Sequence, residues 1–275
     1  MTVLDEAQDY SEYLTFAEGL ARQAADIFRT GFEQSTSNVQ LKGAVDLVTD
    51  TDHSIENYII NSIKTRYPDH LIVAEESVAA GDMNKEITDV QTWIVDPVDG
   101  TTNFVHRLCM TCISIGLAIK KQVVVGVVFN PIMNELFTAV RGQGARLNGK
   151  LLHVSSTDNL KSALVATGFP YNRSDQLIDH ILLNCKVVLK NCRDIRRLGS
   201  AALDMCYVAR GIFDLYYETG VQPWDVAAAS LIVEEAGGHV MDMYDSAFHL
   251  GLGRIACGNP GLVKKLNQVL VRPQD

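Results

Sequence analysis

Apolar residues recur at helical spacing in two stretches near the start of the chain. In the first, steps of three or four residues connect Leu14, Ala17, Ala21, Ala24 and Phe28. This spacing predicts an amphipathic helix that ends near Gly31. A second helix is expected after Asp52, with Pro68 beyond its end. Its apolar face consists of Ile55, Tyr58, Ile59 and Ile63.

Shorter apolar runs follow, and their lengths are typical of buried strands. We expect strands at residues 71–74 and 93–95. Two more strands between residues 111 and 129 flank the polar tripeptide Lys120-Lys121-Gln122, which predicts a hairpin. Further strands are expected at 135–140 and 151–154, with turn glycines between them. Together these patterns predict an antiparallel meander in the first half of the chain.

Helix and strand patterns alternate in the second half. Strands are expected at residues 163–167, 212–217 and 239–243. Helices are expected at 175–189, 201–209 and 224–236, the last closed by Gly237-Gly238. Neither a linker nor an internal repeat divides the chain. We therefore predict the α/β (α+β layered) class, with one continuous core in a single domain, 1–275, built from the halves 1–155 and 156–275.

Charge and composition limit which classes of partner this chain is expected to bind. The net charge is −9, which disfavours nucleic acid as a partner. A small anionic substrate is still compatible with this charge, because bound cations reverse the local sign. The acidic start of the chain is unlike a secretory signal, and no apolar run is long enough to span a membrane. We therefore expect a cytoplasmic protein with no membrane or nucleic-acid partner.

The cysteines give little sign of a metal or redox site. Six are scattered along the chain, and only Cys109 and Cys112 form a CxxC pair, with His106 nearby. No second pair completes a recognisable zinc-binding set. Reduced thiols in a cytosolic protein are therefore expected.

The segment 93–103, WIVDPVDGTTN, is the strongest chemical signal. An apolar strand runs into Asp96, and we expect Pro97 to take the chain out of the sheet because it cannot donate to the ladder. Asp99 then returns a second carboxylate, and Gly100 lets a ligand approach the backbone. Thr101 begins a run of helix-start residues whose N–H groups suit a phosphate. Carboxylates for hard cations beside such donors suit metal-assisted phosphoryl chemistry.

Three other acidic positions could converge on the same place. Glu75 directly follows a buried strand, Asp52 opens the second helix, and Asp225 opens the helix at 224–236. Each also has a plainer interpretation, as a helix cap or a solvated loop acid. If these residues converge with Asp96 and Asp99, the cluster is costly to keep ionised without cations.

At these residues the chain resembles the inositol monophosphatase family along nearly its whole length. Two long signatures carry the resemblance, WIVDPVDGTTNFV at 93–105 and WDVAAASLIVEEAGGH at 224–239. Shorter matches are DLVTDTD at 46–52, EES at 75–77 and GSAALDMCY at 199–207. The resemblance implies the alternating αβαβα layers of that fold, a Mg²⁺-dependent phosphatase and a homodimer.

The resemblance also implies ligands for two to three Mg²⁺ ions. Glu75, Asp96 and the carbonyl of Val98 would hold the first ion. Asp96, Asp99 and Asp225 would hold the second, and Glu75 with waters a weaker third. These carboxylates agree with the ligands that two-metal phosphoryl chemistry requires.

The implied catalytic pair is Asp52 and Thr101, which would orient and deprotonate a metal-bound water for in-line attack on phosphorus. The implied substrate-binding set comprises Glu75, Val98, Asp99, Gly100, Thr101, Gly199, Ser200, Ala201, Glu218 and Asp225. Within it, Gly100 and Thr101 would donate N–H groups to the phosphate, whereas the turn at Gly199 and Glu218 would contact sugar hydroxyls. Lys42 would belong to a loop near the third metal.

We therefore predict hydrolysis of myo-inositol monophosphate, with several alternatives open. The segment 167–171, TGFPY, resembles bacterial-type members, which leaves galactose 1-phosphate, glucose 1-phosphate, glycerol 2-phosphate and histidinol phosphate as other substrates. A haloacid-dehalogenase-type phosphatase would need one residue between its two aspartates, whereas two separate Asp96 from Asp99. A catalytically silent metal-binding or partner-binding protein is a further alternative. NAD binding is disfavoured, because Gly142-Gln143-Gly144 lies in the meander.

Overall fold

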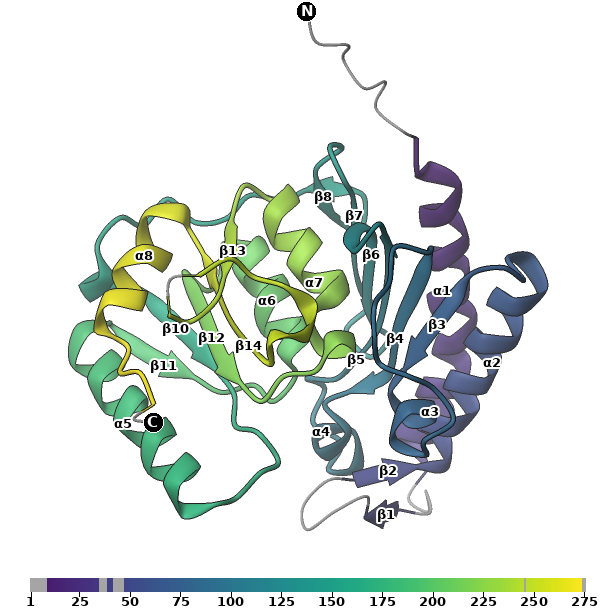
Figure 1. Cartoon of the computed structure of the whole chain (residues 1–275), viewed down its shortest axis with the longest axis horizontal. Coiled ribbons are helices and arrows are strands. Elements are labelled where there is room, and N and C mark those ends of the chain that lie inside the picture. Colours follow the sequence, from purple (N-terminus) through teal and green to yellow (C-terminus); the bar gives the residue numbers. More distant parts are fainter. Residues whose placement is uncertain (1–8, 35–38, 42–46, 245, 274–275) are drawn as a thin grey trace, which may run out of the picture.

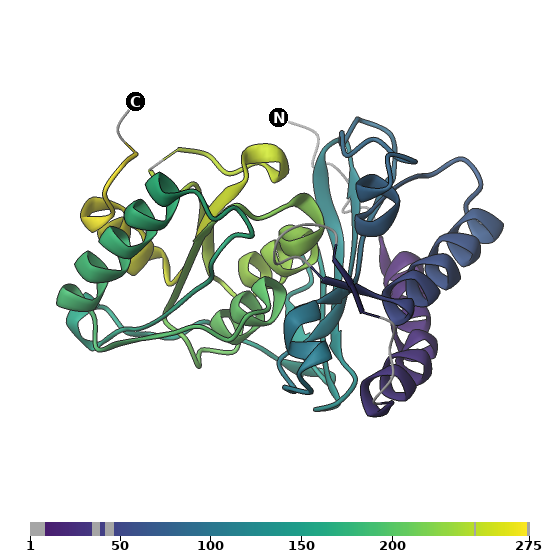
Figure 2. The same cartoon turned by 90° about the horizontal axis from the view of Figure 1, so that it is seen from below.

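The computed structural model describes residues 9–34, 39–41, 47–244 and 246–273. Layers of helix and sheet alternate in the order αβαβα, as Figures 1 and 2 show in two orientations. One outer layer consists of α1 (Ser11–Glu33) and α2 (Asp50–Arg66), which pack on a seven-stranded sheet. This arrangement confirms the predicted α/β class and its layers. Within the described part of the chain, no helix is long and apolar enough to cross a membrane.

The seven-stranded sheet has the order β3-β4-β5-β6-β7-β8-β9. Its strands are β3 (Leu71–Ala74), β4 (Thr92–Asp99), β5 (Cys112–Ile119), β6 (Gln122–Asn130), β7 (Glu135–Val140), β8 (Ala145–Leu147) and β9 (Lys150–Leu151). β3 pairs parallel with β4, and every later pair is antiparallel, which confirms the meander. Lys120 and Lys121 have positive φ angles of 50° and 62°, as a tight two-residue hairpin turn requires.

Strand β4 continues past the point where we expected it to end. Pro97 does not take the chain out of the sheet, because β4 extends to Asp99, which pairs with Cys112 of β5. The register shifts between Asp96 and Asp99, so Pro97 lies in an irregular part of the ladder where its missing N–H is tolerated. Both aspartates are therefore held by the same strand, and its last residue is Asp99.

The second sheet has five strands in the order β11-β10-β12-β14-β13. They are β10 (Leu164–Thr167), β11 (Asp194–Arg196), β12 (Leu215–Thr219), β13 (His239–Met241) and β14 (Arg254–Gly258). β10 is parallel to both β11 and β12, so these three strands end at one edge. Helices α5 (Asp175–Asn191) and α8 (Pro260–Val269) cover the outer face. A small antiparallel pair, β1 (Val39–Leu41) and β2 (Leu47–Thr49), precedes α2.

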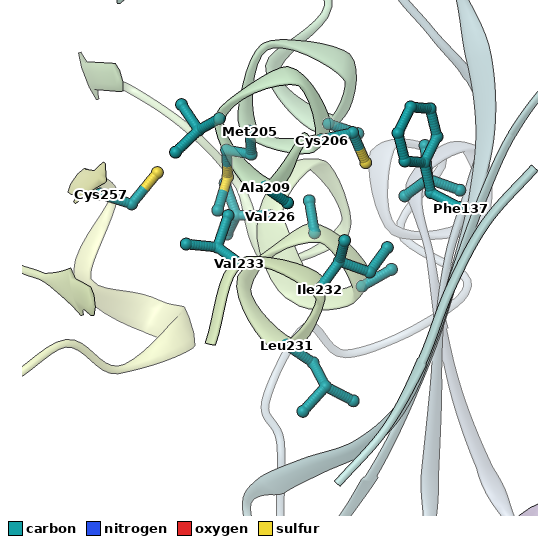
Figure 3. Close-up of a cluster of buried hydrophobic side chains, with 14 of the residues drawn as sticks. Phe137, Met205, Cys206, Ala209, Val226, Leu231, Ile232, Val233 and Cys257 are labelled. Atoms are coloured by element: carbon teal, nitrogen blue, oxygen red, sulfur yellow. The ribbon is translucent and has the colours of Figure 1, made fainter. Parts of the chain in front are cut away.

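Helices α6 (Ala201–Ala209) and α7 (Pro223–Glu235) form the middle layer between the sheets. Figure 3 shows their side chains packed between Phe137 of β7 and Cys257 of β14. A Cβ atom on Gly126 would lie 2.5 Å from the carbonyl oxygen of Ala228, so this strand glycine lets α7 approach β6 closely. Buried apolar residues form three clusters, of which the middle one joins both sheets to α6 and α7. The two halves therefore share a core as expected, but two separate clusters lie outside it, beneath the outer helices.

Several element boundaries also differ from the sequence predictions. The strand expected at 151–154 is reduced to β9, and the strand expected at 212–217 is displaced to β12. Ile212 and Phe213 instead form a turn whose N–H groups both donate to the carbonyl of Tyr207 at the end of α6. Their apolar side chains gave the strand signal, although the backbone there closes a helix. The elements that the sequence patterns did not reveal are β1, β2, α3, β8, β11, β14, α8 and the short 3₁₀ helices at Leu160–Ser162 and Leu250–Leu252.

Candidate active site

The predicted site residues lie where strands end and helices begin. β3 leads directly into α3 (Glu75–Ala79), and β4 leads through Gly100 into α4 (Thr101–Val105). The starts of α6 and α7 reach the same region. The amide of Ala202 donates to the Asp99 carboxylate, and the Ser114 hydroxyl donates to the carbonyl of Trp224.

Asp52 and Thr101 lie together, although 49 residues separate them in the chain. Asp52 is fully buried, and its Oδ2 accepts hydrogen bonds from the amide of Thr49 at 3.1 Å and from its hydroxyl at 2.5 Å. The Thr101 hydroxyl lies 3.0 Å from the carbonyl oxygen of Val98 and 3.4 Å from Asp52 Oδ1. Because Asp52 is fixed by its capping role, its other oxygen stays beside Thr101.

The carboxylates of β4 are held by different partners. Asp96 Oδ1 accepts a hydrogen bond from the amide of Val98 at 3.0 Å. Asp99 Oδ2 accepts from the Ser200 hydroxyl at 2.6 Å and from the Ala202 amide at 2.8 Å. Burial raises the pKa of Asp99 to about 6, and the nearby charge of Glu75 adds to this rise. The hydrogen bonds from Ser200 and Ala202 act in the opposite direction and lower the pKa.

Asp225 and Glu75 complete the acidic cluster. Asp225 Oδ2 accepts a hydrogen bond from the amide of Gln222 at 2.7 Å, so Asp225 is a helix cap as its plainer interpretation expected. Desolvation raises the pKa of Asp225 well above its ordinary value, and the charges of Asp99 and Glu75 add to this rise. The same residue is thus both a cap and a member of the cluster.

The cluster fits a divalent cation by the chemistry of its donors. Among the described residues, no three His, Cys, Asp or Glu side chains are already arranged as a complete metal site. Carboxylate oxygens are nevertheless the ligands that Mg²⁺ prefers. Burial and mutual repulsion raise the pKa values of Asp99 and Asp225, and a bound cation would counteract both causes.

The polyol-facing residues of the prediction also meet. Gly100 has a φ of 86°, and a Cβ atom there would lie 3.0 Å from the carbonyl oxygen of Gly199. Ser200 and Ala201 begin α6 directly after that glycine. Glu218, near the end of β12, accepts a hydrogen bond from the Tyr216 hydroxyl at 2.6 Å. Burial raises the pKa of Glu218 to about 7.

The sequence patterns missed two buried carboxylates near the site, of which Asp204 has a pKa raised by burial and further by the nearby charges of Glu218 and Asp99. The Glu56 carboxylate accepts hydrogen bonds from the amides of Glu76 and Ser77, so it fixes the start of α3 next to Glu75. Asp204 on α6 is buried, and its Oδ1 has no hydrogen-bond partner. An acidic residue in the apolar stripe of a helix was the only available signal for either one.

Two further predictions have simple outcomes. All six cysteines are free thiols, which agrees with the reduced state expected for Cys109 and Cys112. Lys42 lies outside the described residues, as does Asp46 at the start of the DLVTDTD match.

The chain is similar to known proteins along nearly its whole length. The model of the inositol monophosphatase family matches residues 9–274. An inositol monophosphatase of Dictyostelium discoideum is 41% identical over 261 residues, which cover 94% of this chain and 95% of the relative. Inositol monophosphatase 2 of Solanum lycopersicum is 48% identical over 252 residues, covering 91% and 95%. The solved structure of the extragenic suppressor protein suhB from Bartonella henselae superimposes with a TM-score of 0.86 at 33% identity, covering 96% of this chain and 100% of that one. The chain therefore belongs to the inositol monophosphatase family.

Proposed function

We propose that this protein is a Mg²⁺-dependent phosphomonoesterase that hydrolyses myo-inositol monophosphate to myo-inositol and phosphate. The observation that carries the proposal is the hydrogen bond between Asp52 and Thr101. Thr101 lies two residues along the chain from Asp99, whose charge adds to the rise that burial causes in the pKa of Asp225. Two relatives of nearly equal length are inositol monophosphatases by name, which supports the choice of substrate.

Mg²⁺ would be held by the carboxylates of the cluster. Glu75, Asp96 and the carbonyl of Val98 would bind a first ion. Asp96, Asp99 and Asp225 would bind a second, and Glu75 a weaker third. When bound, the cations supply Lewis acidity and neutralise the charge of the phosphate.

Thr101 and Asp52 would activate the attacking water. Thr101 Oγ would accept a proton from water while its own proton passes to Asp52 Oδ1, 3.4 Å away. The oxygen of that water forms a bond to phosphorus as the bond to the polyol oxygen breaks. The leaving alkoxide then takes a proton from solvent, so no covalent enzyme intermediate is needed.

The remaining site residues would orient the substrate. Gly100 and Thr101 would donate backbone N–H groups to phosphate oxygens. Asp99, Glu218 and the turn from Gly199 through Ser200 to Ala201 would contact the hydroxyl groups of the polyol. Galactose 1-phosphate, glucose 1-phosphate, glycerol 2-phosphate and histidinol phosphate are the alternative substrates.

We also propose that the protein is a cytoplasmic homodimer. Free thiols support the reducing compartment. The dimer is supported by α5, which buries only Asn184 and Val188. Leu182 and Leu189 lie seven residues apart on this helix and are each 55% exposed. An uncovered apolar stripe of this kind is typical of an interface.

Phosphate release tests the function directly. With myo-inositol 1-phosphate, we expect turnover in Mg²⁺, loss of turnover in excess chelator and inhibition by Li⁺. The same assay with the alternative substrates ranks them by kcat/KM. Undiminished turnover in chelator would disprove the metal requirement, and no turnover with any substrate would favour a silent binding protein.

Replacing Thr101 tests the route of the proton. Thr101→Ala should lower kcat by about 10²–10⁴-fold, because general-base assistance is lost while the metal ligands remain. The stabilisation of the fold by Mg²⁺ should stay close to that of the parent. Thr102→Ala is the matched control, since Thr102 is the exposed neighbour on α4. If the variant fails only through weaker Mg²⁺ binding, Thr101 has been given the wrong role.

The molar mass of the protein, measured by light scattering as it elutes from a size-exclusion column, tests the dimer. The parent should have the mass of two chains, and Leu182→Glu combined with Leu189→Glu should have the mass of one, because buried charges oppose association. Leu151→Glu is the control, since Leu151 is also 55% exposed but lies on β9. A monomeric parent at micromolar concentration, or a double variant that stays dimeric, contradicts this assignment.

A further inference from the structure

Gly168 lies against a carboxylate that the proposed function uses. It directly follows β10, where Thr167 pairs with Tyr217 of β12. A Cβ atom built on Gly168 would lie 1.8 Å from Oε2 of Glu218, 2.2 Å from its Cδ and 2.4 Å from its Oε1. All three distances are far shorter than the roughly 3.5 Å at which non-bonded atoms pack. No other residue type fits here while Glu218 keeps its position.

The backbone gives no separate reason for a glycine at this position. Gly168 is not among the glycines with positive φ, so its conformation is open to any residue. Gly220, on the neighbouring segment, differs because its φ is 91°. The close approach of the Glu218 carboxylate is therefore the feature that requires Gly168.

The loop side of this contact is held in place by its own contacts. The Thr167 hydroxyl donates to the carbonyl of Tyr217 at 2.8 Å, which ties the loop to β12 just before Gly168. Two residues later, Pro170 packs so closely on Gly220 that a Cβ atom there would lie 2.4 Å from the Pro170 Cβ. The loop is thus fixed on both sides of Gly168, and a new side chain would have to displace Glu218.

A buried tyrosine holds the Glu218 carboxylate in its position. Tyr216 and Glu218 are two residues apart on β12, so their side chains lie on the same face. The Tyr216 hydroxyl donates to Oε2 at 2.6 Å. Burial holds the pKa of Tyr216 well above its ordinary value, so the hydroxyl keeps the proton that it donates. Oε2 thus accepts this hydrogen bond and is also the carboxylate atom nearest the Cβ position of Gly168.

We propose that Gly168 is a specificity-determining positioning residue, which lets the Glu218 carboxylate lie back against the loop after β10 and so receive a polyol hydroxyl. The inference rests on the proposed contact between Glu218 and the polyol. A side chain at 168 would move the carboxylate away from this loop and misplace the acceptor. The kcat/KM for substrates that present a hydroxyl group would fall. That for phosphate esters without one would not, because the substitution leaves the phosphate-binding part of the site unchanged.

Steady-state kinetics of Gly168→Ala with two substrates tests this selectivity. At saturating Mg²⁺, kcat/KM for myo-inositol 1-phosphate should fall at least about tenfold, mainly through KM, because a hydrogen bond to the substrate is lost. The value for 4-nitrophenyl phosphate should change less than about twofold. Gly19→Ala is the matched control, since nothing lies within 4 Å of its Cβ position and its φ is not positive. Equal losses on both substrates would overturn the inference.

A double-mutant cycle with Glu218→Ala shows whether Gly168 acts through that side chain. Once Glu218 is truncated, Gly168→Ala should cause no further loss of kcat/KM.

Melting temperatures of the same variants give a measure of the contact that does not depend on activity. Gly168→Ala should lower the melting temperature of the parent by about 2–4 °C or more, and leave that of Glu218→Ala unchanged. Additive losses in both measures would show that Gly168 acts elsewhere. A parent inactive on both substrates would instead refute the proposed function, while the melting cycle would still report the contact.

Discussion

The carboxylates of Asp99 and Asp225 are held close together where they are poorly solvated, and the rest of the site is arranged around them. Desolvation raises the pKa of Asp99 to about 6 and that of Asp225 well above its ordinary value. Each carboxylate also caps or anchors a helix of the middle layer, since Asp99 accepts from Ser200 and Ala202, and Asp225 from Gln222. The fold therefore holds in place charges that repel one another.

The layered architecture makes this arrangement possible. β4 supplies carboxylates from the first sheet, α7 supplies another from the middle layer, and β12 brings Glu218 from the second sheet. Small residues keep these layers close. Gly126 admits the backbone of α7 onto β6, and Gly168 admits a carboxylate onto the loop after β10. A site assembled from three layers depends on their spacing, so under the proposed function a glycine away from the phosphate would affect recognition of the polyol.

The sequence predicted the local elements better than the contacts between them. β3, α6 and β7 have the predicted boundaries, because each is a continuous apolar or amphipathic run. Pro97 wrongly predicted an early end of the strand, since a register shift keeps it inside β4. Only the family resemblance predicted a shared site for Asp52, Glu75, Asp99 and Asp225, because spacing along a chain does not determine which strand ends meet. Glu56, Gly168 and Asp204 were missed for the same reason, as their importance depends on neighbours that are distant in sequence.

Melting temperature as a function of pH, with and without Mg²⁺, tests most directly whether cations relieve this repulsion. The folded-state pKa values of Asp99 and Glu218 are about 6 and about 7, raised from the ordinary 3.8 and 4.5. A raised carboxyl pKa contributes stability that is complete below its unfolded value and is lost as pH rises through the folded value. The metal-free protein should therefore melt at progressively lower temperature from about pH 4 to about pH 7, between the unfolded and the folded pKa values, and should change little above about pH 7. Mg²⁺ should stabilise it increasingly over the same range. A metal-free melting temperature that is constant or rises over this range, with an equal effect of Mg²⁺ at both ends, would contradict the account.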